Sequence, residues 1–117
     1  MTRTVTIDGG EVLFRASAAV PRLYRIKFKR DILVDMKAIN EAIQASGAEA
    51  STIPPKALTL FENVAYIMAK HADKDHVPDD PDKWLDGFET FSIYAVFPVI
   101  QEMWADNLAQ LNQPQKK

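Results

Sequence analysis

Cysteine is absent from the 117 residues, and histidine occurs only twice, as His71 and His76. Without cysteine the chain has no disulfide framework, no thiolate metal site and no cysteine nucleophile. The same absence suits a reducing compartment such as the cytoplasm. Two histidines, five positions apart, supply too few nitrogen ligands for a zinc site and little support for a serine–histidine triad. We therefore expect no metal and no nucleophilic catalysis.

Long apolar runs and glycine-rich loops are missing as well. No segment approaches the roughly 20 apolar residues that a membrane helix needs, and the opening MTRTVTIDGG has no signal-peptide core. Gly9-Gly10 belongs to no G-x-G-x-x-G motif or lysine-bearing phosphate loop. The acidic run from Asp73 to Asp80 lacks the mid-loop glycine and terminal glutamate of an EF-hand. We therefore expect no membrane partner, no cofactor and no enzymatic activity.

The composition that remains is that of an ordinary globular domain. Apolar residues make up 47% of the chain and charged residues 26%, and a chain of this length can bury a core without disulfides or metal. Neither an internal repeat nor a linker divides it. We expect a single domain over residues 1–112 and a frayed tail over 113–117.

The net charge of −2 hides a strong asymmetry. Residues 1–30 contain seven Lys/Arg against two Asp/Glu, whereas residues 71–90 contain seven Asp/Glu against two Lys. Opposite charge at two places in one chain can pair within the molecule or between copies of it.

Local patterns predict a mainly α, α+β fold, with an N-terminal β-hairpin followed by three to four packed helices. In TVTIDGGEVLFRAS, apolar and polar residues alternate on both sides of Asp8-Gly9-Gly10, which is typical of a hairpin turn. A helix is expected over about 21–44, because Pro21 suits a first turn and an apolar stripe recurs every three to four residues. That stripe consists of Tyr24, Phe28, Ile32, Met36, Ile39 and Ile43.

The second half of the chain supplies the other predicted helices. The segment 56–72 is apolar nearly all round, so Phe61, Val64 and Met68 should lie in the core. A short helix should begin after Asp80 as its cap. A last helix, beginning after Ser92, should continue an apolar seam through Leu108 and Leu111, with a kink or break near Phe97 because Pro98 lies inside it.

The basic segment PRLYRIKFKRDI can be interpreted in two ways. Its five basic residues within nine positions, together with Tyr24 as a stacking ring, would suit a nucleic-acid-binding or regulatory module built on helix 21–37. However, Tyr24 belongs to the apolar stripe, the acidic segment would repel phosphate, and no recognised motif is present. Ile26 and Leu33 lie among the basic residues and form a second, small apolar strip where a partner could dock. We therefore interpret the segment as a protein-facing or solvated helix face and not as a nucleic-acid surface.

Three stretches carry a resemblance to a known family. PRLYRIKFKRDILVDM, the preceding EVLFRASA and the downstream DKWLDGFETFSIYAVFPVIQEMW resemble the tail assembly chaperones of long-tailed, siphovirus-type bacteriophages and prophages of Gram-positive bacteria. The resemblance extends from about Val5 to Leu108. At the position of Lys29 the family usually has glycine.

The resemblance implies a non-catalytic chaperone. Such a protein would bind the tape measure protein and help to recruit tail tube subunits, in the cytoplasm of the bacterial host, and would be absent from the mature virion. Family members self-associate, and the charge asymmetry offers a head-to-tail contact between copies, without nucleic acid. The residues expected to make protein contacts are Arg22, Arg25, Ile26, Lys29, Arg30, Leu33, Asp79, Asp80 and Asp82.

Overall fold

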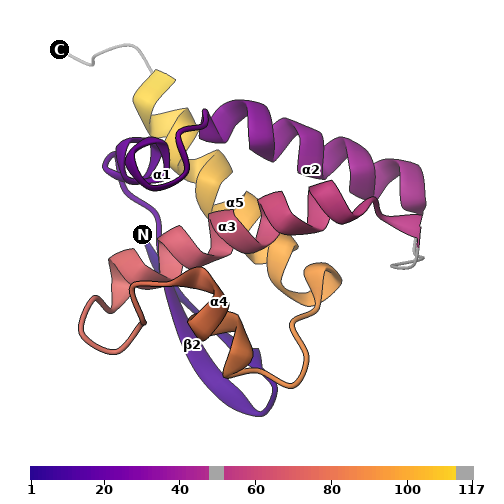
Figure 1. The fold of residues 1–117 in the computed structure, drawn as a ribbon. Coiled ribbons are helices and arrows are strands. Elements are labelled where there is room, and N and C mark those ends of the chain that lie inside the picture. Colours follow the sequence, from indigo (N-terminus) through magenta and orange to yellow (C-terminus); the bar gives the residue numbers. More distant parts are fainter. Residues whose placement is uncertain (48–51, 113–117) are drawn as a thin grey trace, which may run out of the picture.

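The computed structural model describes the backbone of residues 1–47 and 52–112, and the side chains of these ranges as far as Ala105. The expected tail over 113–117 and the expected burial of Leu108 and Leu111 lie outside the described residues. The chain forms an N-terminal hairpin followed by packed helices (Figure 1), which confirms the predicted α+β class. No helix of the described part is long and apolar enough to cross a membrane.

The hairpin consists of β1 (Thr2–Ile7) and β2 (Gly10–Arg15), paired antiparallel with Thr2 opposite Arg15 and Ile7 opposite Gly10. Asp8 and Gly9 form the turn, both with positive φ, as the type I′ hairpin turn requires. A two-stranded ribbon needs support, and β1 contacts α5 while β2 contacts α3. Phe14, which is fully buried, fixes the inner face of the hairpin in the core.

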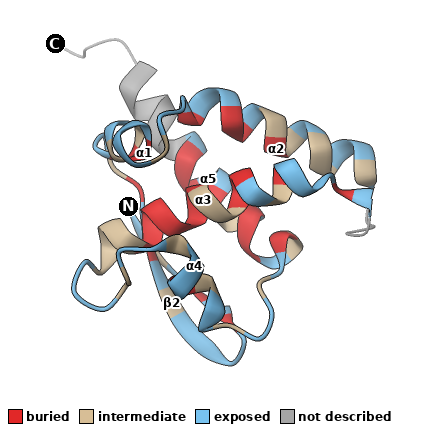
Figure 2. Cartoon of the chain, in the orientation of Figure 1, coloured by how far each residue is buried: buried red, intermediate tan, exposed pale blue. Residues whose placement is uncertain are grey.

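Helix α3 (Pro55–Ala72) is the centre of the fold, because it contacts β2 and each of the other four helices. Phe61, Val64 and Met68 are all at most 1% exposed, which confirms their predicted place in the core. Figure 2 shows buried residues along α3 and exposed residues on the outer sides of the surrounding helices. Helix α3 is apolar nearly all round because other elements pack against it on several sides.

The expected continuous helix over 21–44 is wrong. The chain forms α1 (Val20–Phe28) and α2 (Ile32–Ser46) instead, so that the described part has five helical segments. Lys29 ends α1 in the left-handed conformation, with φ 60° and ψ 37°. Asp31 is extended, and its Oδ1 accepts a hydrogen bond of 2.9 Å from the Leu33 N–H, which caps α2. A C-terminal cap and an N-terminal cap in succession therefore divide the predicted helix.

The remaining two helices follow the expected pattern. Asp80 caps α4 (Pro81–Asp86) by accepting a hydrogen bond of 3.0 Å from the Asp82 N–H, as predicted. Helix α5 spans Ile93–Asn112 and continues through Pro98, so the chain does not break near Phe97. A kink at that point stays a prediction.

Candidate interaction surface

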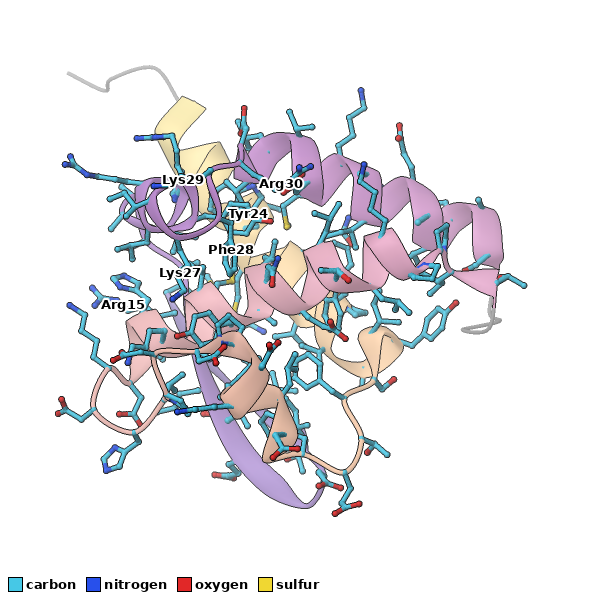
Figure 3. All side chains as sticks on the ribbon, in the orientation of Figure 1. Arg15, Tyr24, Lys27, Phe28, Lys29 and Arg30 are labelled. Atoms are coloured by element: carbon cyan, nitrogen blue, oxygen red, sulfur yellow. The ribbon has the colours of Figure 1, made fainter. Side chains whose placement is uncertain are left out.

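The basic segment lies on the outside of the molecule, distributed over α1, the turn after it and the start of α2. Arg22, Arg25, Lys27, Lys29 and Arg30 are all exposed, as expected for a charged helix face. Figure 3 shows that two of them lie on different sides: Lys27 lies on the side of α1 toward α3, and Arg30 lies beside α2.

Arg30 is held inside its own chain by the only buried charged residue among the described positions, Asp35. The guanidinium donates from Nε to Asp35 Oδ2 and from Nη2 to Asp35 Oδ1, each at 2.8 Å. The Tyr24 hydroxyl donates to the same Oδ2 at 2.7 Å. The break between α1 and α2 makes this possible, because it lets Arg30 turn back toward a carboxylate five residues later.

The titration of this cluster follows from its contacts. Burial by itself raises the pKa of the Asp35 carboxyl, but the hydrogen bonds from Arg30 and Tyr24 outweigh it, so that the pKa lies below its ordinary value. Burial and the neighbouring Asp35 carboxylate raise the pKa of the Tyr24 phenol. Asp35 is therefore ionised and Tyr24 neutral at pH 7. Tyr24 is fully buried and cannot serve as the stacking ring of a nucleic-acid surface.

A surface groove of about 710 Å³ lies between α1 and the C-terminal part of α3; we call it the α1–α3 groove. Apolar side chains of both helices and lysines from both sides line it. The lining consists of Leu23, Ile26, Lys27, Lys29, Tyr66, Ile67, Lys70, His71, Lys74 and Asp79.

Asp79, expected to meet the basic helix of another copy, meets basic residues of its own chain in this groove. The Lys70 ammonium lies 2.8 Å from Asp79 Oδ1, and the Lys27 ammonium donates to the Asp79 carbonyl at 2.8 Å. Hydrogen bonding to Lys70 lowers the pKa of the Asp79 carboxyl. The acidic connection and the basic helix therefore pair within the molecule at this point.

Leu33 lies apart from Ile26, although both were expected on one helix among the same basic residues. A second groove, of about 460 Å³, lies between α1 and α2; we call it the α1–α2 groove. Leu33 lines it together with Arg25, Lys29 and Arg30. Ile26 and Leu33 are 57% and 48% exposed, so both are open to a partner. Among the described residues, Lys29 alone lines both grooves.

Arg22 lines neither groove, and Asp80 and Asp82 lie at the start of α4, exposed to solvent. The structure thus brings Arg25, Lys29, Arg30 and Leu33 together, and Ile26, Lys29 and Asp79 together. It does not bring Asp80 or Asp82 into either groove.

The two histidines have different surroundings. His71 Nε2 lies 2.8 Å from Ser17 Oγ, a contact that joins the segment after β2 to the end of α3. Burial, with Arg15 and Lys74 nearby, lowers the pKa of the His71 imidazole. His76 contacts Asp73 at 2.9 Å, and this hydrogen bond raises the pKa of its imidazole. Among the described residues no group of three or more His, Asp and Glu side chains could hold a metal ion.

Comparison with protein-family models, with curated proteins and with solved structures finds no match to this chain.

Sequence reasoning missed the contribution of α3 to this surface. Lys70 and Lys74 are four positions apart at the end of the predicted 56–72 helix and the start of the acidic connection. A spacing of four indicates that the two lysines lie on the same side of the chain, but it does not indicate that they lie near residue 27. Asp35 was missed as well, although it lies on the apolar stripe three residues after Ile32.

Proposed function

We propose that the chain is a non-catalytic tail assembly chaperone that binds the tape measure protein and helps to recruit tail tube subunits before the phage tail is complete. The observation that carries this proposal is the exposure of large aliphatic side chains beside cationic ones. Ile26 and Leu33 are 57% and 48% exposed, and they lie within or next to the basic segment. Apolar surface kept soluble by charge suits a protein that covers another protein for a limited time.

The conformation of Lys29 supports the family resemblance. Lys29 has φ 60°, a backbone conformation that glycine adopts at no steric cost. The tail assembly chaperones that the chain resembles usually have glycine at this position. A glycine there would fit the end of α1 as the structure has it.

Self-association belongs to the same proposal. Copies would join head to tail through the basic side near Arg22, Arg25 and Lys29, with exposed acids near the start of α4 on the next copy. Asp79 and Arg30 have partners in their own chain, so the intermolecular acids are better sought at Asp80 and Asp82. A contact between two different surfaces produces rings or open helices, which suits repetition along an elongated protein.

Removal of the gene from the phage or prophage genome tests the proposal. After induction, electron microscopy should show filled heads without tails, and a plasmid copy of the gene should restore tailed, infectious particles. Tails of normal length and number in the absence of the gene would contradict a role in tail assembly.

A further inference from the structure

We propose that the α1–α3 groove binds the apolar side of an acidic amphipathic helix from a partner protein. The inference rests on the proposed function, in which that helix belongs to the tape measure protein. It adds the location of the binding site and the chemistry of the segment that occupies it.

The floor of the groove is aliphatic and partly open. Leu23 and Ile26 of α1 lie across from Ile67 of α3, and Ile26 is the most exposed of the three. A groove of about 710 Å³ has room for several aliphatic side chains. Binding of the apolar side of a helix in a groove between two helices is a common mode of peptide recognition.

Cationic groups lie on both sides of that floor. Lys27 and Lys29 belong to α1 and the turn after it, whereas Lys70 and Lys74 belong to the end of α3 and the residues after it. Asp79 shows how the groove holds a carboxylate, because its Oδ1 lies 2.8 Å from the Lys70 ammonium. Among the described residues, the ammonium groups of Lys29 and Lys74 have neither a hydrogen bond nor an ion pair. Two cations therefore remain for the acidic residues of a partner.

The residues that line the α1–α3 groove favour a protein helix over a nucleic acid as its ligand. The nucleobases of a single strand bind to proteins by stacking on exposed aromatic side chains. Among the described residues of the lining, two side chains carry rings, and neither is exposed. Tyr66 is 1% exposed, and its hydroxyl donates to the Pro78 carbonyl at 2.6 Å. The imidazole of His71 is half-buried, with Nε2 2.8 Å from Ser17 Oγ. The aliphatic floor of the groove and the lysines on its two sides are complementary to a helix whose apolar stripe is bordered by Asp or Glu.

The probe is a fluorescein-labelled helical peptide of about 20 residues, with leucine at the a and d positions of each heptad and glutamate at e and g. One control peptide has the same composition with the leucines dispersed around the helix, and another has lysine in place of glutamate. Fluorescence anisotropy with the full chain should show binding of the acidic striped peptide at least about tenfold tighter than of either control, since loss of stripe or charge removes a whole class of contact.

Paired variants test the two parts of the groove. Ile26→Gln should weaken peptide binding about fivefold to twentyfold, because the peptide would bury the part of this side chain, 57%, that is now exposed. The matched variant Val34→Gln removes an equally exposed residue outside the groove and should leave binding unchanged. Lys74→Gln should weaken binding and reduce its dependence on salt, whereas Lys83→Gln on α4 should do neither.

The two histidines give an independent readout of the location. His71 lines the α1–α3 groove, whereas His76 lines a separate one beside β2. In proton NMR spectra, added peptide should shift the imidazole signals of His71 and leave those of His76 in place.

Several results would overturn the inference. Equal binding of the dispersed-leucine peptide, equal effects of Ile26→Gln and Val34→Gln, or an unshifted His71 would each show that the groove is not the site. A single-stranded RNA that displaces the peptide, with affinity lost in Lys74→Gln, would assign the groove to nucleic acid. Oligomers that dissociate in Ile26→Gln while peptide binding persists would assign Ile26 to contacts between copies.

The inference and the proposed function can fail separately. If the tape measure protein binds the Ile26→Gln chain as well as the original chain, the groove assignment fails and the chaperone role stands. If the acidic peptide binds as expected but the tape measure protein does not bind the chain at all, the groove assignment stands and the chaperone role fails.

Discussion

Lys29 carries a conformational cost that the sequence does not reveal. Its φ of 60° disfavours side chains with a Cβ, by about 1–3 kcal/mol. We expect Lys29→Gly to raise the free energy of unfolding by about 0.5–1 kcal/mol, because relief of strain exceeds the entropy that glycine adds to the unfolded chain. Lys37→Gly, inside α2, is the matched control and should lower stability by about 1 kcal/mol. Urea denaturation measures both, and equal losses in the two variants would contradict the assigned conformation.

Asp35 links stability to pH. Its carboxylate accepts hydrogen bonds from Arg30 and Tyr24, and its pKa in the folded state lies below the ordinary value. The resulting stabilisation is therefore present above about pH 4 and is lost as the pH falls through the folded-state pKa.

Asp35→Asn tests this linkage. At pH 7 we expect a loss of about 2 kcal/mol, because the charge-assisted bonds disappear in a buried site. The difference from the original chain should be constant above about pH 5 and should shrink below about pH 4. Asp75→Asn, at an exposed position, should change stability by less than about 0.5 kcal/mol. A difference that is independent of pH would show that the carboxylate is not what stabilises the turn.

Among the elements, α3 determines the core. Phe61 is 1% exposed and packs against Phe91 and Phe97, with ring centroids 5.2 and 6.2 Å apart. Phe61→Ala should lower the free energy of unfolding by about 3–5 kcal/mol, through lost burial and the cavity left behind. Thermal denaturation followed by circular dichroism measures the change, with exposed Thr59→Ala as control. An unchanged melting temperature for Phe61→Ala would place the core elsewhere.

At this scale, hydrophobic periodicity predicted the hairpin, α3 and the capped α4. It failed at positions 29–31, because the apolar stripe continues with the same spacing through the break: Phe28 ends α1 and Ile32 begins α2. The stripe reports which residues face the core, and it does so correctly for Tyr24, Ile32 and Met36. The backbone between α1 and α2 depends on Asp31, which caps α2. The apolar stripe over 21–44 favoured one continuous helix, and this cap was therefore not predicted.

The candidate surface was only partly predictable for a related reason. The exposure of Ile26 and Leu33 could be predicted from their place among charged residues, in the segment expected to form one helix. The α1–α3 groove did not, because it joins Lys27 to residues such as Lys70 and Asp79, more than forty positions away. Contacts of that range depend on how α1 packs on α3, which sequence spacing does not specify.

For the molecule as a whole, we predict self-association tuned by salt. Exposed charge pairs contribute only about 0–1 kcal/mol each, so salt should weaken oligomers modestly, and Leu33→Ala should weaken them more. Light scattering over a concentration series, at low and high salt, measures the mass, and Val34→Ala is the matched control from the same helix. A strict monomer at high concentration in both buffers would contradict the head-to-tail contact and leave tape measure binding as the whole of the proposal.

In the proposed function, the chain keeps a tape measure protein soluble until the tail is assembled. The most direct measurement is co-expression of the tagged chain with the tape measure protein of the same genome, followed by affinity purification. We expect the tape measure protein to stay in the soluble fraction, to elute with the tagged chain, and to bring tail tube subunits when these are also expressed. A tape measure protein that is equally insoluble with and without the chain, and absent from the eluate, would contradict the proposed function.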